Sequence, residues 1–182
     1  MIAIYVIVAV IVAGAIGGAV ALRARRPRAR YEGKGRILVP FSGALDPTVL
    51  SAAIRIARAE EATLVPAYLL VVPLQYPEES PRKDQVAVAV PVLEAVELAA
   101  LRAGVPVDAR IEKGRSLTHA LRRLWEVERF DRIIAPAPAA SSRGFTPKDL
   151  TWILRHAPAE TLILRPSPDG AVPVVRVGGA DS

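Results

Sequence analysis

Short apolar segments alternate with segments of helical periodicity between residues 36 and 166, and this alternation constrains the fold most strongly. The predicted strands are Arg36–Phe41, Thr63–Val72, Val105–Ile111, Asp131–Ala135 and Thr161–Arg165. Most are continuous apolar runs too short for a helix, which is typical of strands buried on both faces. Strict alternation with helices predicts an α/β fold, a doubly wound five-stranded parallel sheet in three layers with right-handed crossovers.

Four predicted helices fill the intervals, and capping signals mark their ends. They run from Asp46 to about Glu61, from about Asp84 to Ala103, from Ser116 to about Arg129 and from Thr146 to His156. Asp46 and Thr146 each supply an N-cap side chain ahead of a proline at the first helical position. Pro91 either kinks the second helix or marks its true start, and Gly104 closes that helix as a left-handed cap. Gly114 is expected to turn the chain before the third helix.

The segment from Met1 to Leu22 contains no charged side chain. As a helix it would extend roughly 33 Å, which is enough to cross a bilayer. Basic residues follow the apolar run rather than precede it, which predicts an uncleaved anchor and not a signal peptide. Because basic residues stay on the cytoplasmic side, the flanking charges predict a single-pass cell-membrane protein with a cytoplasmic body. The predicted parts are a transmembrane helix at 1–22, a basic juxtamembrane linker at 23–35, a folded domain at 36–166 and a disordered tail at 167–182.

The positive charge of the chain is concentrated beside this anchor. Residues 23–36 hold seven basic residues against Glu32, which accounts for the whole net charge of +6. From Ile37 onward basic and acidic residues balance, so the body has no excess field for phosphate backbones and no nucleic-acid partner is expected. The basic segment suits anionic headgroups, so residues 1–36 are predicted to contact membrane lipid. The absence of Cys and the presence of only two His exclude thiolate chemistry and predict no metal site.

The end of the predicted domain carries the most specific motif. A helix ending in Ile153–Pro158, with the sequence Ile-Leu-Arg-His-Ala-Pro, is followed by the short apolar strand in Thr161–Pro166. Together with Ile37–Pro40 and the helix after it, this arrangement resembles the universal stress protein family over roughly residues 36–166. The resemblance implies a strand order of 3-2-1-4-5 and a homodimer built along the last strand. In many members it also implies an adenine nucleotide, ATP or AMP, at the first and fourth strands.

The nucleotide motif of that family is altered at each matching position. Nucleotide-binding members carry an Asp after the first strand, where this chain has Ser42, and a Gly-Ser or Gly-Thr pair that aligns here with Pro147–Lys148. Proline has no N–H to donate to a phosphate. Pro136 and Pro138 stand in the loop after the fourth strand, where the family pattern has glycines that permit close backbone approach. These departures predict that the usual site is lost.

Polar residues remain on both loops and form the candidate ligand-binding set. They are Ser42, Gly43, Ser141, Ser142, Arg143, Gly144 and Thr146. This set has two interpretations, an anion site ahead of a helix N-terminus or a polar surface loop with an N-cap. No residue is assigned a catalytic or metal-binding role.

These observations favour a membrane-anchored universal stress protein-like module, regulatory or protein-binding, without catalytic activity and without the usual ATP site. A neighbouring membrane transporter is one partner that such a module would serve. The alternative is a membrane-tethered sensor that still binds an adenine nucleotide or another anion through the loops after the first and fourth strands. A remote alternative is an ATP-using enzyme, because Phe41–Pro47 resembles the phosphate loop of PP-loop pyrophosphatases, although Ala44 and Pro47 break that motif.

Overall fold

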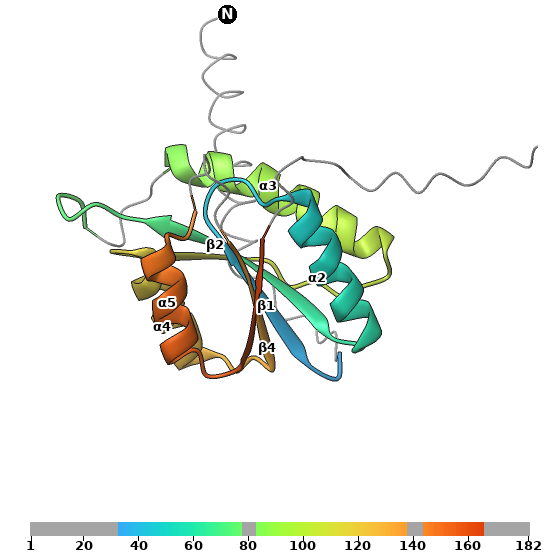
Figure 1. The fold of residues 1–182 in the computed structure, drawn as a ribbon. Helices are drawn as coiled ribbons and strands as arrows, with labels where there is room; N and C mark the ends of the chain where they lie inside the picture. The colour runs from blue at the N-terminus through green and yellow to red at the C-terminus, as the bar shows by residue number, and fades with distance from the viewer. Residues whose placement is uncertain (1–32, 78–82, 138–143, 166–182) are drawn as a thin grey trace, which may run out of the picture. The chain divides into compact units, whose positions relative to one another are not determined.

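A five-stranded parallel sheet with the strand order β3-β2-β1-β4-β5 forms the centre of the computed structural model (Figure 1). The structure describes residues 33–77, 83–137 and 144–165. The strands are β1 (Arg36–Phe41), β2 (Thr63–Val71), β3 (Arg110–Gly114), β4 (Arg132–Pro136) and β5 (Glu160–Leu164). The helices are α2 (Pro47–Ala59), α3 (Lys83–Arg102), α4 (Leu117–Val127) and α5 (Pro147–His156). The predicted parallel sheet and its order are therefore confirmed.

The predicted transmembrane helix at 1–22 and the predicted tail at 167–182 lie outside the described residues. The linker at 23–35 also lies outside them, except for its last three residues. Among the helices that the structure does describe, none combines the length and the hydropathy needed to cross a bilayer.

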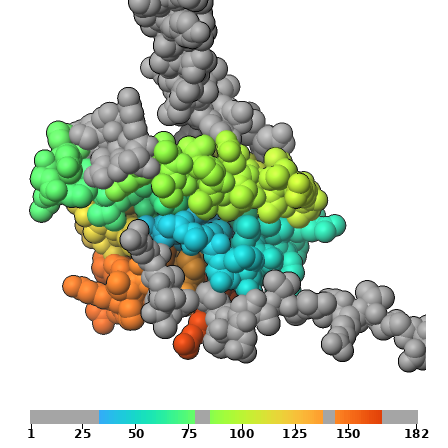
Figure 2. All heavy atoms as spheres, turned by 90° about the horizontal axis from the view of Figure 1, so that it is seen from above, coloured from blue at the N-terminus to red at the C-terminus, as the bar shows by residue number. Residues whose placement is uncertain are grey.

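Helices cover both faces of the sheet, and this arrangement buries the central strand. On one face, α4 and α5 pack against Leu38, Leu69 and Ile133 through residues such as Leu124 and Ile153. On the other face, α2 and α3 lie side by side over the sheet (Figures 1 and 2) and form two adjoining apolar clusters with it. Strand β1 pairs with β2 on one side and with β4 on the other, so the strand is buried from its second residue onward. The predicted three-layer architecture is confirmed.

The third strand is where the prediction was wrong. It was expected at Val105–Ile111, but the regular ladder with β2 begins only where Arg110 pairs with Ala67. Before that point, only an isolated bridge joins Val107 to Leu64. Pro106 contributes no N–H, and its carbonyl accepts from Leu64 N at 2.8 Å. The edge strand itself is mostly polar and lacks an apolar pattern. The alternation of apolar residues occurs before it, so the strand was predicted too early in the sequence.

Three backbone predictions concern single residues. Pro91 lies inside α3 and does not mark its start, since the helix begins at Lys83. Pro91 is exposed, so the carbonyl that its missing N–H leaves unbonded can face solvent. Gly104 follows α3 with φ +72°, which confirms the left-handed cap. The remaining strand ends differ from the predicted ones by one residue at most.

Gly114 does not turn the chain, because it is the last residue of β3. Its constraint is a close approach to α4, since a Cβ atom built there would lie 2.5 Å from Ala120 N. Backbone cannot give way as a flexible side chain can. Glycine is therefore required by packing between β3 and the first turn of α4.

Charged side chains join the amino ends of β1 and β3 to the end of α4. One Arg36 nitrogen lies 2.9 Å from both Asp108 and Glu128, and Arg110 contacts the same two carboxylates at 2.7 and 3.1 Å. The backbone N–H of Arg36 also donates to Asp131, in the loop before β4, at 2.7 Å. This network fixes the point at which the chain enters the sheet.

Gly114→Ala is expected to lower the free energy of unfolding by about 1–3 kcal/mol, because the added methyl group overpacks the contact with α4. Urea denaturation followed by circular dichroism measures this. Gly144→Ala is the matched control, since a Cβ there meets nothing within 4 Å and little change is expected. Equal stability of the two variants would contradict the close-packing assignment.

Glu112 in β3 is a half-buried carboxylate, and burial raises its pKa above the ordinary value of 4.5, although Arg110 and Arg123 oppose the shift. Because the folded-state pKa is raised, the protonated carboxyl contributes stability that is present below pH 4.5 and is lost as pH rises through the raised pKa. Glu112→Gln is therefore expected to stabilise the protein at pH 7 and to lose that advantage at pH 4. Urea unfolding at both values, with the exposed Glu126→Gln as control, checks it; a pH-independent difference would contradict it.

Candidate functional site

The candidate site lies at the carboxyl edge of the sheet, between β1 and β4. These strands are neighbours, yet the chain passes from β1 to a helix on one face and from β4 to a helix on the other. Such a switch point is where open α/β sheets bind ligands. Ser42 and Gly43 directly follow β1, and Gly144 and Thr146 precede α5 at the same edge. The other predicted site residues, Ser141, Ser142 and Arg143, lie outside the described residues.

Apolar side chains fix both loops to the core. Phe145, directly before the N-cap of α5, is buried in the cluster under α4 and α5. Leu45, directly before the N-cap of α2, packs against both clusters on the opposite face. Phe41 ends β1 in an edge-to-face contact with Tyr68, at 5.4 Å between ring centroids. Leu45 and Phe145 are not among the predicted site residues. The only sign of their anchoring role in the sequence is a lone apolar residue before each N-cap.

The N-terminus of α2 is closed by the carboxylate of Asp46. Its Oδ1 atom accepts from Thr48 N at 2.8 Å and from Val49 N at 3.4 Å. Pro47, the first helical residue, has no N–H. The predicted N-cap is therefore present, and the backbone donors of the first turn point at a side chain of the protein itself.

The N-terminus of α5 is closed in a similar way, by the predicted capping box. Thr146 Oγ1 accepts from Asp149 N at 3.2 Å, and Asp149 Oδ2 accepts from Thr146 N at 2.9 Å. The Thr146 hydroxyl also donates to Asp149 Oδ2 at 2.7 Å. Pro147 occupies the first helical position. The structure thus places a carboxylate where a helix would otherwise attract a phosphate.

Both helices that begin at the switch point are therefore capped by the chain's own side chains, α2 by Asp46 and α5 by the capping box of Thr146 and Asp149. A helix N-terminus binds anions through N–H groups that lack a partner and through the positive end of its dipole. Here, Asp46 accepts from donors in the first turn of α2, Thr146 Oγ1 accepts from the Asp149 N–H of α5, and the carboxylates of Asp46 and Asp149 place negative charge beside both helix ends. The described residues of this site consequently fit a phosphate group poorly.

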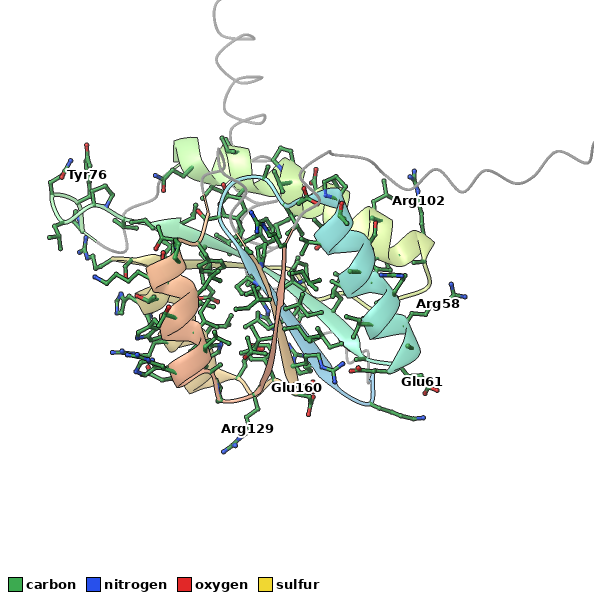
Figure 3. The ribbon with its side chains drawn as sticks, viewed as in Figure 1. Arg58, Glu61, Tyr76, Arg102, Arg129 and Glu160 are labelled. Atoms are coloured by element: carbon green, nitrogen blue, oxygen red, sulfur yellow. The ribbon has the colours of Figure 1, made fainter. Side chains whose placement is uncertain are left out.

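A guanidinium group holds the neighbouring loop after β2. Arg115 Nη1 donates to the carbonyls of Val72, Pro73 and Tyr76, at 3.3, 2.9 and 2.8 Å. Figure 3 shows Tyr76 on this loop, beyond the end of β2. Arg115 is not among the predicted site residues, because no sequence motif connects it to a loop about forty residues earlier. Its role is to shape the edge of the sheet beside the candidate site.

Neither histidine belongs to the candidate site. His119, in the first turn of α4, accepts a hydrogen bond at Nδ1 from Arg115 N at 3.1 Å. His156 is the last residue of α5, and its Nδ1 lies 2.8 Å from the Trp152 carbonyl. Over residues 33–77, 83–137 and 144–165, no group of three or more His, Asp or Glu side chains is arranged to hold a metal ion.

No family model and no curated protein match this sequence, but solved structures match the fold. A protein from the universal stress protein family of Burkholderia pseudomallei superposes with a TM-score of 0.55 at 22% identity, covering 76% of this chain and 98% of that one. The domain has the universal stress protein fold. A universal stress protein in complex with cAMP superposes at 0.57 with 18% identity, over 71% of this chain and 96% of its own.

A third universal stress protein structure, from Arabidopsis thaliana with AMP bound, has a TM-score of 0.56 and 14% identity, over 74% of this chain and 94% of that one. The universal stress protein fold predicted from the sequence is thus confirmed. At these identities the likeness concerns the fold, and a shared fold does not determine the chemistry of a site, which depends on the side chains present.

Asp46→Ala is expected to lower the free energy of unfolding by about 1 kcal/mol, because the donors of the first turn of α2 lose their acceptor. Asp46→Asn is the matched control, since asparagine caps nearly as well and removes only the charge. Chemical denaturation of both variants measures the difference. If Asp46→Asn cost as much as Asp46→Ala, the ionised carboxylate rather than the cap geometry would be what stabilises α2.

Proposed function

We propose that this chain is a membrane-anchored, non-catalytic module with the universal stress protein fold that regulates or binds other proteins and lacks the usual nucleotide site. The observation that carries the proposal is the capping of α2 by Asp46 and of α5 by Thr146 with Asp149, which leaves a carboxylate at each helix end. A phosphate at this edge would have to displace a carboxylate from its hydrogen bonds or share the space with it. Either outcome costs free energy, so the site favours no nucleotide.

Membrane anchoring rests on the sequence of residues 1–36. An uncharged run of about 22 residues is long enough to span a bilayer, and the basic cluster after it orients the folded domain to the cytoplasm. A membrane transporter is a fitting partner, because such an anchor keeps the module beside integral membrane proteins. This partner is proposed from location alone.

A homodimer along β5 is the proposed assembly of the folded domain, as the family resemblance implies. Strand β5 is the edge of the sheet, with β4 as its neighbour. Ile163 on this strand is 36% exposed, so the edge has apolar surface for a second copy to cover. The mass of the chain lacking residues 1–22, measured by light scattering, tests the dimer against a monomer.

A second candidate function is a nucleotide sensor, and the cAMP and AMP complexes among the structural neighbours favour it. In this chain the ligand would contact Ser42, Gly43 and the segment from Ser141 to Thr146. The two functions differ in whether the carboxylates at the helix ends allow a phosphate to approach.

Calorimetric titration of the full chain in lipid nanodiscs with AMP, cAMP and ATP separates the two. No heat of binding is expected at millimolar nucleotide. The double variant Asp46→Asn/Asp149→Asn keeps polar caps and removes both negative charges, so any weak affinity for AMP should increase in it. Micromolar binding by the unchanged chain would overturn the proposal and support the sensor.

A further inference from the structure

A stack of aromatic rings lies at the outer surface between α4 and α5. Trp125 on α4 and Trp152 on α5 stack with centroids 5.4 Å apart and ring planes 6° apart. The ring of His156 also stacks on Trp152, with centroids 4.8 Å apart and ring planes 17° apart. The guanidinium of Arg122 lies 5.5 Å from the Trp152 centroid. Both indoles are partly exposed.

Basic side chains surround this stack. Lys148 and Arg155 are exposed and lie four residues before and three residues after Trp152, so they share its side of α5. Figure 3 shows side chains ending in nitrogen that project outward from α4 and α5, on the left of the view. We call Arg122, Trp125, Lys148, Trp152, Arg155 and His156 the aromatic-basic face.

Three acidic side chains lie near this face. Asp149 is held in the capping box, and Glu128 is held in the ion network with Arg36 and Arg110. Glu126 is an exposed carboxylate on α4, four residues after Arg122. Arg122, Lys148 and Arg155 stand against Asp149 and Glu126, three charges against two, so the face keeps an excess of one positive charge, although the body as a whole is neutral.

Tryptophan and basic side chains together are the combination that the headgroup region of an anionic bilayer favours, because the rings enter the interface while the cations meet lipid phosphates. A protein partner with an acidic surface would not require the partly exposed indoles.

The linker at residues 23–35, called the tether below, leads into β1 at a point where Arg36 contacts the end of α4. Arg36, the first residue of β1, contacts Glu128 directly after α4 and Asp131 before β4. Figure 3 places Arg129, in the same loop, at the lower edge of the sheet. Residues 23–35 span at most roughly 45 Å when fully extended, so an anchored domain stays within that distance of the bilayer. The loop at the end of α4 is thus among the first parts of the domain that the tether reaches.

We propose that the aromatic-basic face of α4 and α5 docks on the surface of an anionic lipid bilayer. The inference rests on the proposed membrane anchoring, and it adds an orientation of the domain relative to the lipid. Docking leaves α2 and α3, on the opposite face of the sheet, available to other partners.

The two tryptophans of the chain both belong to this face, so intrinsic fluorescence reports on it alone. The full chain is reconstituted into vesicles of phosphatidylcholine with phosphatidylglycerol, in which part of the lipid is brominated near the headgroup. The expected result is quenching of tryptophan emission, which is lost in vesicles of phosphatidylcholine alone and weakens as salt is added. Flotation of the same samples measures anchoring separately.

Arg122→Gln/Arg155→Gln removes two charges from the face and is expected to weaken docking about 30-fold, as a loss of quenching, without changing flotation. Arg55→Gln/Arg58→Gln is the matched control, because it removes two exposed charges from α2 on the opposite layer and should leave quenching unchanged. Flotation without quenching, or equal quenching in neutral vesicles, would overturn the docking surface and leave the anchor intact. Failure to float would overturn the anchor and the docking surface together.

Discussion

The fold depends on the placement of β1 between β2 and β4. Strand β1 pairs with β2 over its whole length and with β4 at Ile37 and Leu38, and helices on both faces cover its side chains, so Ile37 to Phe41 are all buried. Every helical crossover starts or ends at β1 or at one of its two neighbours, β2 and β4. The same placement creates the switch point, because the loops leaving β1 and β4 must pass to opposite faces.

At that switch point, local helix chemistry and ligand binding compete for the same backbone groups. Asp46 and Thr146 with Asp149 give α2 and α5 well-satisfied first turns, which stabilises the two helices. The same hydrogen bonds take up donors that a phosphate would need. An open α/β sheet can thus keep its architecture while the helix ends at its switch point are bonded to the chain's own side chains.

Much of the fold could be predicted from the sequence, because buried parallel strands are apolar runs and these helices carry explicit caps. The misplaced third strand shows the limit. An edge strand such as β3 has polar residues, and its register is set by pairing with β2 rather than by its own pattern. Gly114 illustrates another limit, since its close approach to Ala120 depends on how β3 and α4 meet in space. The Arg115 contacts and the Trp125–Trp152 stack likewise join segments whose proximity no local motif encodes.

The position of β1 at the start of the folded domain has a mechanical consequence. The chain enters the sheet through its central strand, which pairs with β2 along its length and with β4 at Ile37 and Leu38, and which Arg36 holds at its entry through ion pairs. A pull transmitted from residues N-terminal to the domain would run along β1 and load two ladders of hydrogen bonds in shear at once. An edge strand in that position would instead be peeled away one bond at a time, so this connectivity suits a domain that is held by its N-terminus.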